Sequence, residues 1–232
     1  IKNKPIIMSE KKNPAQADQE SVNQAIGIWE KYSKKIIYVS VAVIVIVGGY
    51  LGYKSLILAP KELKASEDLF TAESNFRKDS FNLALNGANG SAGLLKVISK
   101  YSGTAAGNLA RLYAGESYLQ LGEFQKAIDQ LEKFDANGSK QVEAKVEGML
   151  GDAYAEIKKN EKAIDHYRNA GTGFPEDQAL SSEYLFRGGL LSEMSGKTKE
   201  AIELYQIIKD KYPRTEKGFV IDKYLARLGS IQ

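Results

Sequence analysis

The 232-residue sequence contains no cysteine and a single histidine, His166. Without cysteine, the chain has no disulfide framework, no cysteine-based zinc or iron–sulfur site, no cysteine nucleophile and no residue to carry a lipoprotein anchor. One histidine likewise excludes a multi-histidine metal site. We therefore expect neither a metal nor a cofactor.

The larger part of the chain also lacks a basic excess. Residues 1–59 carry eight lysines and four acids, whereas residues 60–232 carry 24 basic and 25 acidic residues. The pI of about 8.7 is therefore a property of the N-terminal part. This balance of charge argues against nucleic acid as a partner of the larger part.

Catalytic motifs are missing as well. Ser195-Gly196-Lys197-Thr198 looks like the end of a phosphate-binding loop, but Leu191 stands where that loop requires a glycine. The sequence has no Gly-x-Ser-x-Gly nucleophile motif. By helical periodicity, His166 faces outward as a surface histidine. We expect a protein that is not an enzyme.

One segment, residues 36–53, has no charge at all, and beyond Lys54 the apolar run continues until it stops at Pro60. As a helix, residues 36–58 would span roughly 35 Å, which is enough for a bilayer core of ~30 Å. We predict a retained transmembrane helix. A buried core helix rarely has so long an uncharged run, and a cleaved signal peptide would begin the chain.

Lysines set the expected orientation of this helix. Three of them lie within residues 31–35, and the N-terminal part is richer in lysine than the opposite flank. This bias predicts a cytoplasmic N-terminus, with the bulk of the chain outside the cytoplasm. Gly48, Gly49 and Gly52 form a small-residue face where another helix could pack, although glycine is also simply tolerated in membrane helices.

Residues 1–35 form a polar tail with one distinct stretch. Within residues 20–33, Val22, Ile26 and Trp29 recur at helical spacing. This pattern predicts either a short amphipathic helix at the membrane surface or an N-terminal extension of the membrane helix. The sequence does not separate the two.

Residues 108–213 contain three copies of one pattern of small residues. Shifts of 36 and then 38 residues relate Gly115, Gly151 and Gly189, and likewise Ala127, Ala163 and Ala201. Small residues allow the two helices of a hairpin to cross closely, so we expect each glycine to face the alanine of its own copy. Pro175 and Pro213 should end the second helices of the later copies.

These residues and their offsets resemble the tetratricopeptide-repeat family. The resemblance implies helical hairpins stacked into a solenoid, with a concave groove lined by the first helix of each hairpin. Two departures stand out. Asn137-Gly138-Ser139 replaces the closing proline of the first copy, and Ser192 occupies an aromatic position of the third.

We predict an all-α chain with one N-terminal transmembrane helix followed by a tetratricopeptide-repeat solenoid of about nine helices. A degenerate repeat should come first, because Lys100-Tyr101-Ser102-Gly103-Thr104 is similar to Lys211-Tyr212-Pro213-Arg214-Thr215. The expected bounds within a repeat domain at 60–232 are a degenerate repeat at 61–104, with helices at 61–79 and around 94–98 joined by a loop, repeats at about 108–140, 144–177 and 182–213, and a capping helix at 215–229.

The family's groove positions carry over to twelve residues of this chain. They are Leu109, Leu112, Glu116 and Leu119 in the first repeat, Lys145, Gly148, Asp152 and Ala155 in the second, and Glu183, Phe186, Leu190 and Glu193 in the third. These mostly apolar or acidic residues favour a hydrophobic or basic segment of another protein. Alternatively, helix 61–79 or the capping helix covers Leu109, Leu112 and Phe186.

The layout of a tail, one membrane helix and a repeat body resembles the YfgM family, in versions typical of Bacteroidota. The likeness includes residues 100–110 leading into residues 118–128. It implies an ancillary subunit of the SecYEG translocon in the bacterial inner membrane. The periplasmic repeats would hold emerging clients together with a PpiD-like chaperone.

Two other kinds of scaffold stay open. One is a subunit of another envelope secretion or outer-membrane assembly machine, against which the missing lipid-bearing cysteine counts. The other is an organellar import receptor with its repeats in the cytosol. Reversed topology and a clamp for a partner's terminal carboxylate would favour the receptor, and the groove residues do not form such a clamp.

Overall fold

The computed structural model describes residues 14–88 and 90–230, and every regular element in that part of the chain is helical. The chain divides into two compact units, residues 1–58 and residues 59–232. We call the second unit the body. The predicted all-α class is confirmed.

The first unit consists of α1 (Pro14–Tyr53) and the π-helical turn η1 (Lys54–Leu58). Residues 20–33 belong to the same continuous helix as the apolar run, so they extend it toward the N-terminus and form no separate helix. The rest of the predicted tail, residues 1–13, lies outside the described residues. Among the described residues, one helical stretch, Trp29–Phe76, is long and apolar enough to cross a membrane. Its most apolar segment is not buried by the rest of the chain.

A new helix begins where the apolar run of the sequence ends. This helix is α2 (Ala59–Phe76), the first helix of the body, and Pro60 is its second residue. A proline is tolerated in the first turn of a helix, where its missing N–H has no intrahelical partner to lose. Pro60 thus marks the end of the apolar run and the start of an α-helix.

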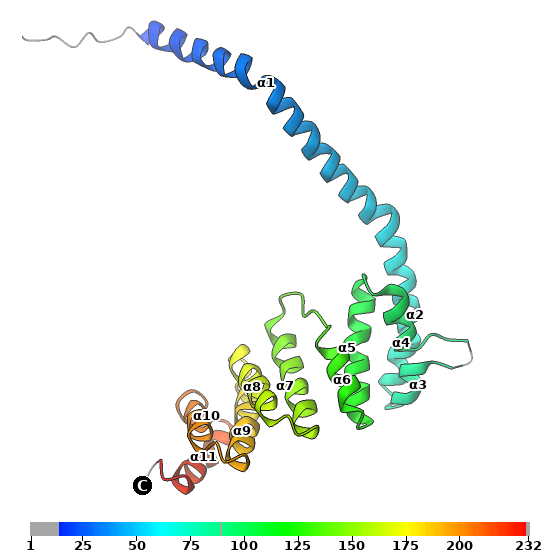
Figure 1. The fold of residues 1–232 in the computed structure, drawn as a ribbon, viewed down its shortest axis with the longest axis vertical. Coiled ribbons are helices and arrows are strands. Elements are labelled where there is room, and N and C mark those ends of the chain that lie inside the picture. Colours follow the sequence, from blue (N-terminus) through cyan, green and yellow to red (C-terminus); the bar gives the residue numbers. More distant parts are fainter. Residues whose placement is uncertain (1–13, 89, 231–232) are drawn as a thin grey trace, which may run out of the picture. The chain divides into compact units, whose positions relative to one another are not determined.

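The described residues of the body form ten helices, α2 to α11, which pack as successive neighbours (Figure 1). After α2 come α3 (Phe81–Asn86), α4 (Leu94–Tyr101), α5 (Ala105–Gln120), α6 (Phe124–Leu131), α7 (Lys140–Glu156), α8 (Asn160–Gly173), α9 (Gln178–Met194), α10 (Thr198–Lys211) and α11 (Glu216–Arg227). The short α3 is the helix that our prediction of about nine helices lacked. It occupies part of the stretch expected to be a loop.

The glycines of the three copies sit at helix crossings, and what lies nearest to each is a large side chain of the second helix and not the alanine that we predicted. A Cβ added at Gly115 would lie 2.5 Å from Leu131, and one at Gly151 would lie 2.6 Å from Tyr167. Gly189 stands in the same relation to Tyr205. Each glycine thus makes room for a large side chain one helical turn beyond the alanine, while the alanines themselves are fully buried.

The two similar segments, residues 100–104 and 211–215, form the same kind of turn into the next helix. Thr104 and Thr215 cap α5 and α11, each accepting a hydrogen bond from the backbone of a glycine three residues on, Gly107 or Gly218. Each threonine hydroxyl also donates to the carbonyl of the tyrosine three residues before it. The two turns are therefore built alike, and α11 begins as the first helix of a repeat does.

Candidate functional site

The predicted groove residues are largely occupied by the body's own packing. Leu109 packs on the core around α2 to α5, and a Cβ on Gly148 would overlap the Tyr184 ring. Phe186 lies against Tyr224 of α11, with ring centroids 4.9 Å apart. Neighbouring helices therefore cover Leu109 and Phe186, which was the alternative that we left open for these side chains. Lys145 and Leu190 stay exposed.

The carboxylates of the predicted groove are paired within the chain. Asp152 accepts from Arg187 at 2.9 Å, and Glu183 accepts from the same arginine at 2.8 Å. Lys217 of α11 lies 3.1 Å from Glu183. Burial alone would raise the pKa of Glu183, but hydrogen bonds from Arg187 and Lys217 hold it below its usual value. These acids are therefore partly neutralised before any partner arrives.

Tyrosine hydroxyls engage further carboxylates along the body. Tyr167 donates to Asp152 at 2.7 Å, and Tyr205 donates to Glu193 at 3.2 Å. Burial, followed by the neighbouring carboxylate, raises the pKa of both tyrosines. Glu193 also accepts from Arg227 of α11 at 2.7 Å. The acidic groove positions in the second and third repeats thus serve the packing of the body.

The three repeats differ most in their second helices. α8 and α10 each have 14 residues, whereas α6 has 8. The second repeat is shifted by 36 residues from the first, and the third by a further 38. With these shifts removed, α8 and α10 both align with residues 124–137 of the first repeat. Residues 132–137 of the first repeat therefore leave the helix where the later repeats continue it.

Asn108 holds the segment that follows the early end of α6 in place. Its side-chain amide donates to the carbonyl of Asp135 at 2.7 Å, and its side-chain oxygen accepts from the Asp135 N–H at 2.9 Å. The equivalent positions in the later repeats are Ala144 and Ser182, which are buried and small. Asn137 then turns the chain with a φ of +50°, and its N–H donates to the Asp135 carboxylate at 2.7 Å.

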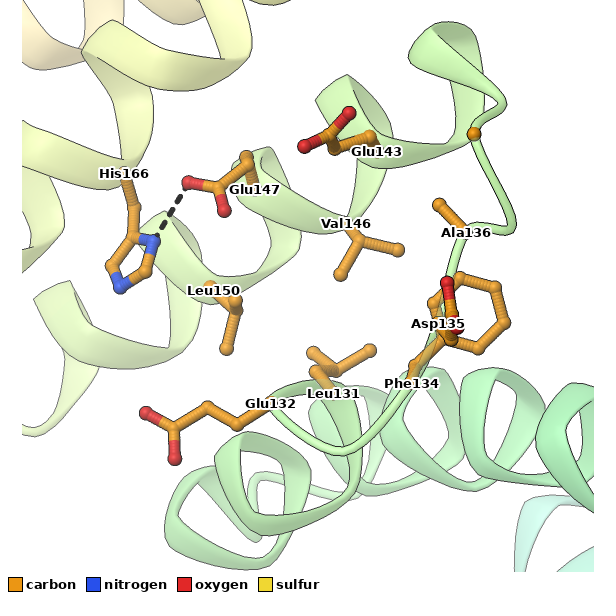
Figure 2. A pocket seen from close by; sticks show the side chains of 11 residues that line it. Leu131, Glu132, Phe134, Asp135, Ala136, Glu143, Val146, Glu147, Leu150 and His166 are labelled. Atoms are coloured by element: carbon orange, nitrogen blue, oxygen red, sulfur yellow. Dashed lines mark hydrogen bonds and ion pairs between the residues drawn. The ribbon is translucent and has the colours of Figure 1, made fainter. Parts of the chain in front are cut away.

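The early end of α6 opens a pocket of about 780 Å³ between α6, α7 and α8 (Figure 2). Its apolar floor consists of Leu131, Phe134, Val146 and Leu150. Its rim carries the carboxylates Glu132, Asp135, Glu143 and Glu147. Among the described residues that line the pocket, none is a lysine or an arginine, and His166 completes the wall.

Glu132 is fixed at one side of the rim. Its carboxylate accepts a hydrogen bond from the Tyr154 hydroxyl at 2.5 Å. Burial and this bond raise the pKa of Tyr154 to about 12. The carboxylate therefore keeps a set position, with one oxygen bonded inward to α7.

Glu147 and His166 form the opposite side, and they correct our reading of the histidine. The His166 Nδ1 lies 2.9 Å from the Glu147 carboxylate, and its ring stacks on Tyr154 with centroids 5.1 Å apart. Asn169 donates to the same carboxylate at 3.1 Å. Burial would raise the pKa of Glu147, but the bonds from His166 and Asn169 hold it below its usual value. His166 is thus a half-buried structural partner and not a free surface residue.

The side chains that line the pocket determine what it can bind. Within residues 14–88 and 90–230, no group of three or more acidic or histidine side chains is arranged to hold a metal ion. The pocket combines an apolar floor with fixed negative charge. It therefore suits an apolar side chain that has cationic neighbours.

Sequence reasoning missed this pocket, because it placed the site on the first helices of the repeats. A signal was nevertheless present. The closing proline of the first repeat is replaced by Asn137-Gly138, a turn-forming pair, and Asn108 stands where the other copies have Ala or Ser. Both departures point to an altered second helix in that repeat.

Comparison with known proteins agrees with this architecture. A tetratricopeptide-repeat family model matches residues 109–137 and 183–215, which are the first and third hairpins. The middle hairpin packs in the same way through Gly151 and Tyr167. The body is therefore a tetratricopeptide-repeat solenoid, a class of fold that binds other proteins.

A solved structure has a similar fold at low sequence identity. A crystal structure of MamA aligns with a TM-score of 0.51 at 21% identity, over 68% of this chain and 85% of the MamA chain. A second crystal structure of MamA aligns with a TM-score of 0.47 at 20% identity, over 71% and 76% of the two chains. A search of curated protein sequences found no match.

Proposed function

We propose that this chain is a membrane-anchored scaffold that holds protein partners on its repeats and catalyses no reaction. The observation that carries the proposal is the pocket formed where α6 ends early. It is preformed, apolar at its floor and acidic at its rim. The predicted groove supports the proposal less, because its carboxylates are largely bonded to Arg187, Lys217 and Arg227.

The anchor in this proposal is the apolar part of α1, residues 36–53 with η1. Its large side chains, such as Ile44 and Ile46, are about 70% exposed within the chain, so a hydrocarbon environment would cover them. The lysines within residues 31–35 favour a cytoplasmic N-terminus. The body would then lie in the periplasm, beside the inner membrane.

Gly48, Gly49 and Gly52 offer that anchor a contact surface. An added Cβ at any of them would meet nothing within 4 Å. A second transmembrane helix could therefore approach the backbone closely along this side. In the proposal, this contact is with a membrane partner of the scaffold.

The partner favoured by the resemblance to the YfgM family is the SecYEG channel. A PpiD-like periplasmic chaperone and emerging client chains would meet the body on the same side of the membrane. A subunit of another secretion or assembly machine would use the same anchor and body. The partner that co-purifies separates these two assignments.

The topology is tested first, and the absence of cysteine makes the test clean. Asn23→Cys lies on the N-terminal side of the apolar run and Glu176→Cys lies in an exposed turn of the body. We expect a membrane-impermeant maleimide, applied from the periplasmic side, to label the second variant and spare the first. Labelling of Asn23→Cys alone would contradict the proposed orientation.

The partner is tested by purification of the full chain from membranes in a mild detergent, with mass spectrometry of what accompanies it. We expect SecYEG subunits in near-stoichiometric amounts, and their loss when residues 36–58 are replaced by an unrelated anchor. Recovery of other secretion components without the channel would overturn the Sec assignment. Recovery of no protein in stable ratio would overturn the scaffold itself.

A further inference from the structure

We infer that the pocket between α6, α7 and α8 binds a short helical segment of a partner protein, which inserts a large apolar side chain between basic residues. The inference rests on the proposed scaffold function and names the chemistry that the scaffold recognises. The shape of the pocket, its floor and its charge support this assignment.

The shape follows from the comparison of repeats. In the second and third repeats, residues 168–173 and 206–211 form the last turns of α8 and α10. Residues 132–137, which correspond to them, form no helix. Four residues of this segment, Glu132, Phe134, Asp135 and Ala136, line the pocket, so the pocket lies where the helix has ended. We expect a helical turn from another chain to fit there.

The floor is apolar and already arranged. Leu131 and Leu150 are at most 4% exposed, and Val146 is 7% exposed, so their positions are set by the core. Phe134 is partly buried and packs on the same cluster. A rigid floor of this kind binds an apolar anchor without a large ordering cost.

The charge selects the neighbours of that anchor. Four carboxylates surround the opening, and the hydrogen bonds to Glu132 and Glu147 are all donated by uncharged groups or by His166. Lys140 lies 2.8 Å from Glu143, where both side chains are exposed, and a partner cation can displace it. The rim therefore favours lysine or arginine on either side of the inserted side chain.

The Asn108 contacts keep the pocket open in the free protein. They hold the backbone of Asp135, which lines the pocket, in its non-helical position. The pocket is thus a built-in feature of the first repeat.

The test uses the full chain in detergent micelles and a dye-labelled synthetic helical peptide about three turns long, with Phe and Leu on one side and Lys flanking them. Fluorescence anisotropy reports its binding. Ala136→Trp fills the pocket from its lining, and we expect it to weaken binding about tenfold or more. Ala179→Trp adds the same ring at an exposed position of α9 and should leave affinity unchanged.

A second variant tests the charge without adding bulk. We expect Glu143→Lys to weaken binding about threefold at low salt, with the difference shrinking as salt rises. Glu176→Lys makes the same change in an exposed turn outside the pocket and serves as its control. Replacing the peptide's lysines by glutamates should abolish binding to the unaltered chain.

Three results would overturn the inference. The first is the absence of peptide binding. The second is equal binding by the Ala136→Trp and Ala179→Trp variants when circular dichroism shows that both are folded. The third is a concentration-dependent dimer that Ala136→Trp abolishes, because such a dimer would assign the pocket to a second copy of the chain. If the peptide does not bind but partners still co-purify, the scaffold stands and this site fails. If the peptide binds but nothing co-purifies, the scaffold fails instead.

Discussion

The first repeat and the two later repeats share one sequence pattern but differ in the length of their second helix. α8 and α10 run for 14 residues and α6 for 8. In all three, a glycine of the first helix accommodates a large side chain of the second. The hairpin crossing is thus preserved, while the end of the hairpin has changed.

This difference shows that a repeat can be altered locally without loss of the solenoid. Each hairpin contacts mainly its neighbours, so a missing helical end in one repeat leaves the next interface intact. The core cluster beside the pocket still buries Leu131, Leu150 and Tyr154. The altered repeat therefore gains a pocket while the hairpin crossing that defines the repeat is kept.

The largest expected effect distinguishes the glycines of the first and third repeats. Gly189→Ala should lower the free energy of unfolding by about 2 kcal/mol, because Tyr205 is fully buried and packed between Phe186 and Tyr224. Gly115→Ala should cost less, because the Cβ there meets the branched Leu131 side chain and not a rigid aromatic ring. At both positions alanine regains roughly 1 kcal/mol of helix propensity.

Chemical denaturation followed by circular dichroism compares these two variants. Gly103→Ala is the matched control, since an added Cβ there meets nothing within 4 Å. Equal destabilisation at Gly115 and Gly189 would show that the first hairpin is as tightly closed as the third. That result would contradict the contrast between the repeats.

The next effect concerns the residue that separates the first repeat from the others. Asn108→Ala removes two hydrogen bonds to Asp135, and it should cost about 1 kcal/mol in exposed surroundings. Hydrogen exchange should speed up at the Asp135 amide, which loses its acceptor. Ser182→Ala, at the equivalent position of the third repeat, should leave exchange at residues 132–139 unchanged. Unaltered exchange in Asn108→Ala would show that another contact holds the loop.

A smaller effect comes from the rim of the pocket. Tyr154→Phe should cost about 1 kcal/mol at neutral pH, because Glu132 loses its donor. The pKa of Tyr154 is raised to about 12. The stabilising contribution of its hydrogen bond is therefore complete below the ordinary tyrosine pKa of ~10, and it is lost as the pH rises from there through the raised pKa. Stability curves of the two proteins should therefore converge between these pH values. A constant difference would contradict the assigned contact.

The smallest effect lies on the other side of the rim. The lowered pKa of Glu147 means that its contribution is present above the ordinary glutamate pKa and is lost as the pH falls through the lowered value. Glu147→Gln should cost less than about 1 kcal/mol at neutral pH, and nothing once the pH is below that value. Glu176→Gln makes the same substitution in an exposed turn outside the pocket and serves as its control.

Much of the fold could be predicted from the sequence, because its signals are periodic. The spacing of glycine and alanine predicted the hairpins, and Pro175 and Pro213 follow the ends of α8 and α10 as expected. The six-residue α3 was missed because so short a helix leaves no periodic pattern.

The site was less predictable for physical reasons. The groove residues were assigned by family position, and position alone does not show that Arg187, Lys217 and Arg227 lie on their carboxylates. The pocket depends on contacts between distant residues, such as Asn108 with Asp135 and Glu147 with His166. No local periodicity encodes such contacts. The replaced proline of the first repeat and Asn108 were the two signals that indicated where to look.

The central claim is that the early end of α6 creates the partner-binding pocket of a membrane-anchored scaffold. The most direct test places a photocrosslinking amino acid at position 136 of the full chain in its native membranes, with position 179 as control. The account predicts crosslinks from position 136 only, to a partner segment whose sequence has a large apolar residue between lysines or arginines. Crosslinks of equal yield from both positions, or to an acidic segment, would contradict it.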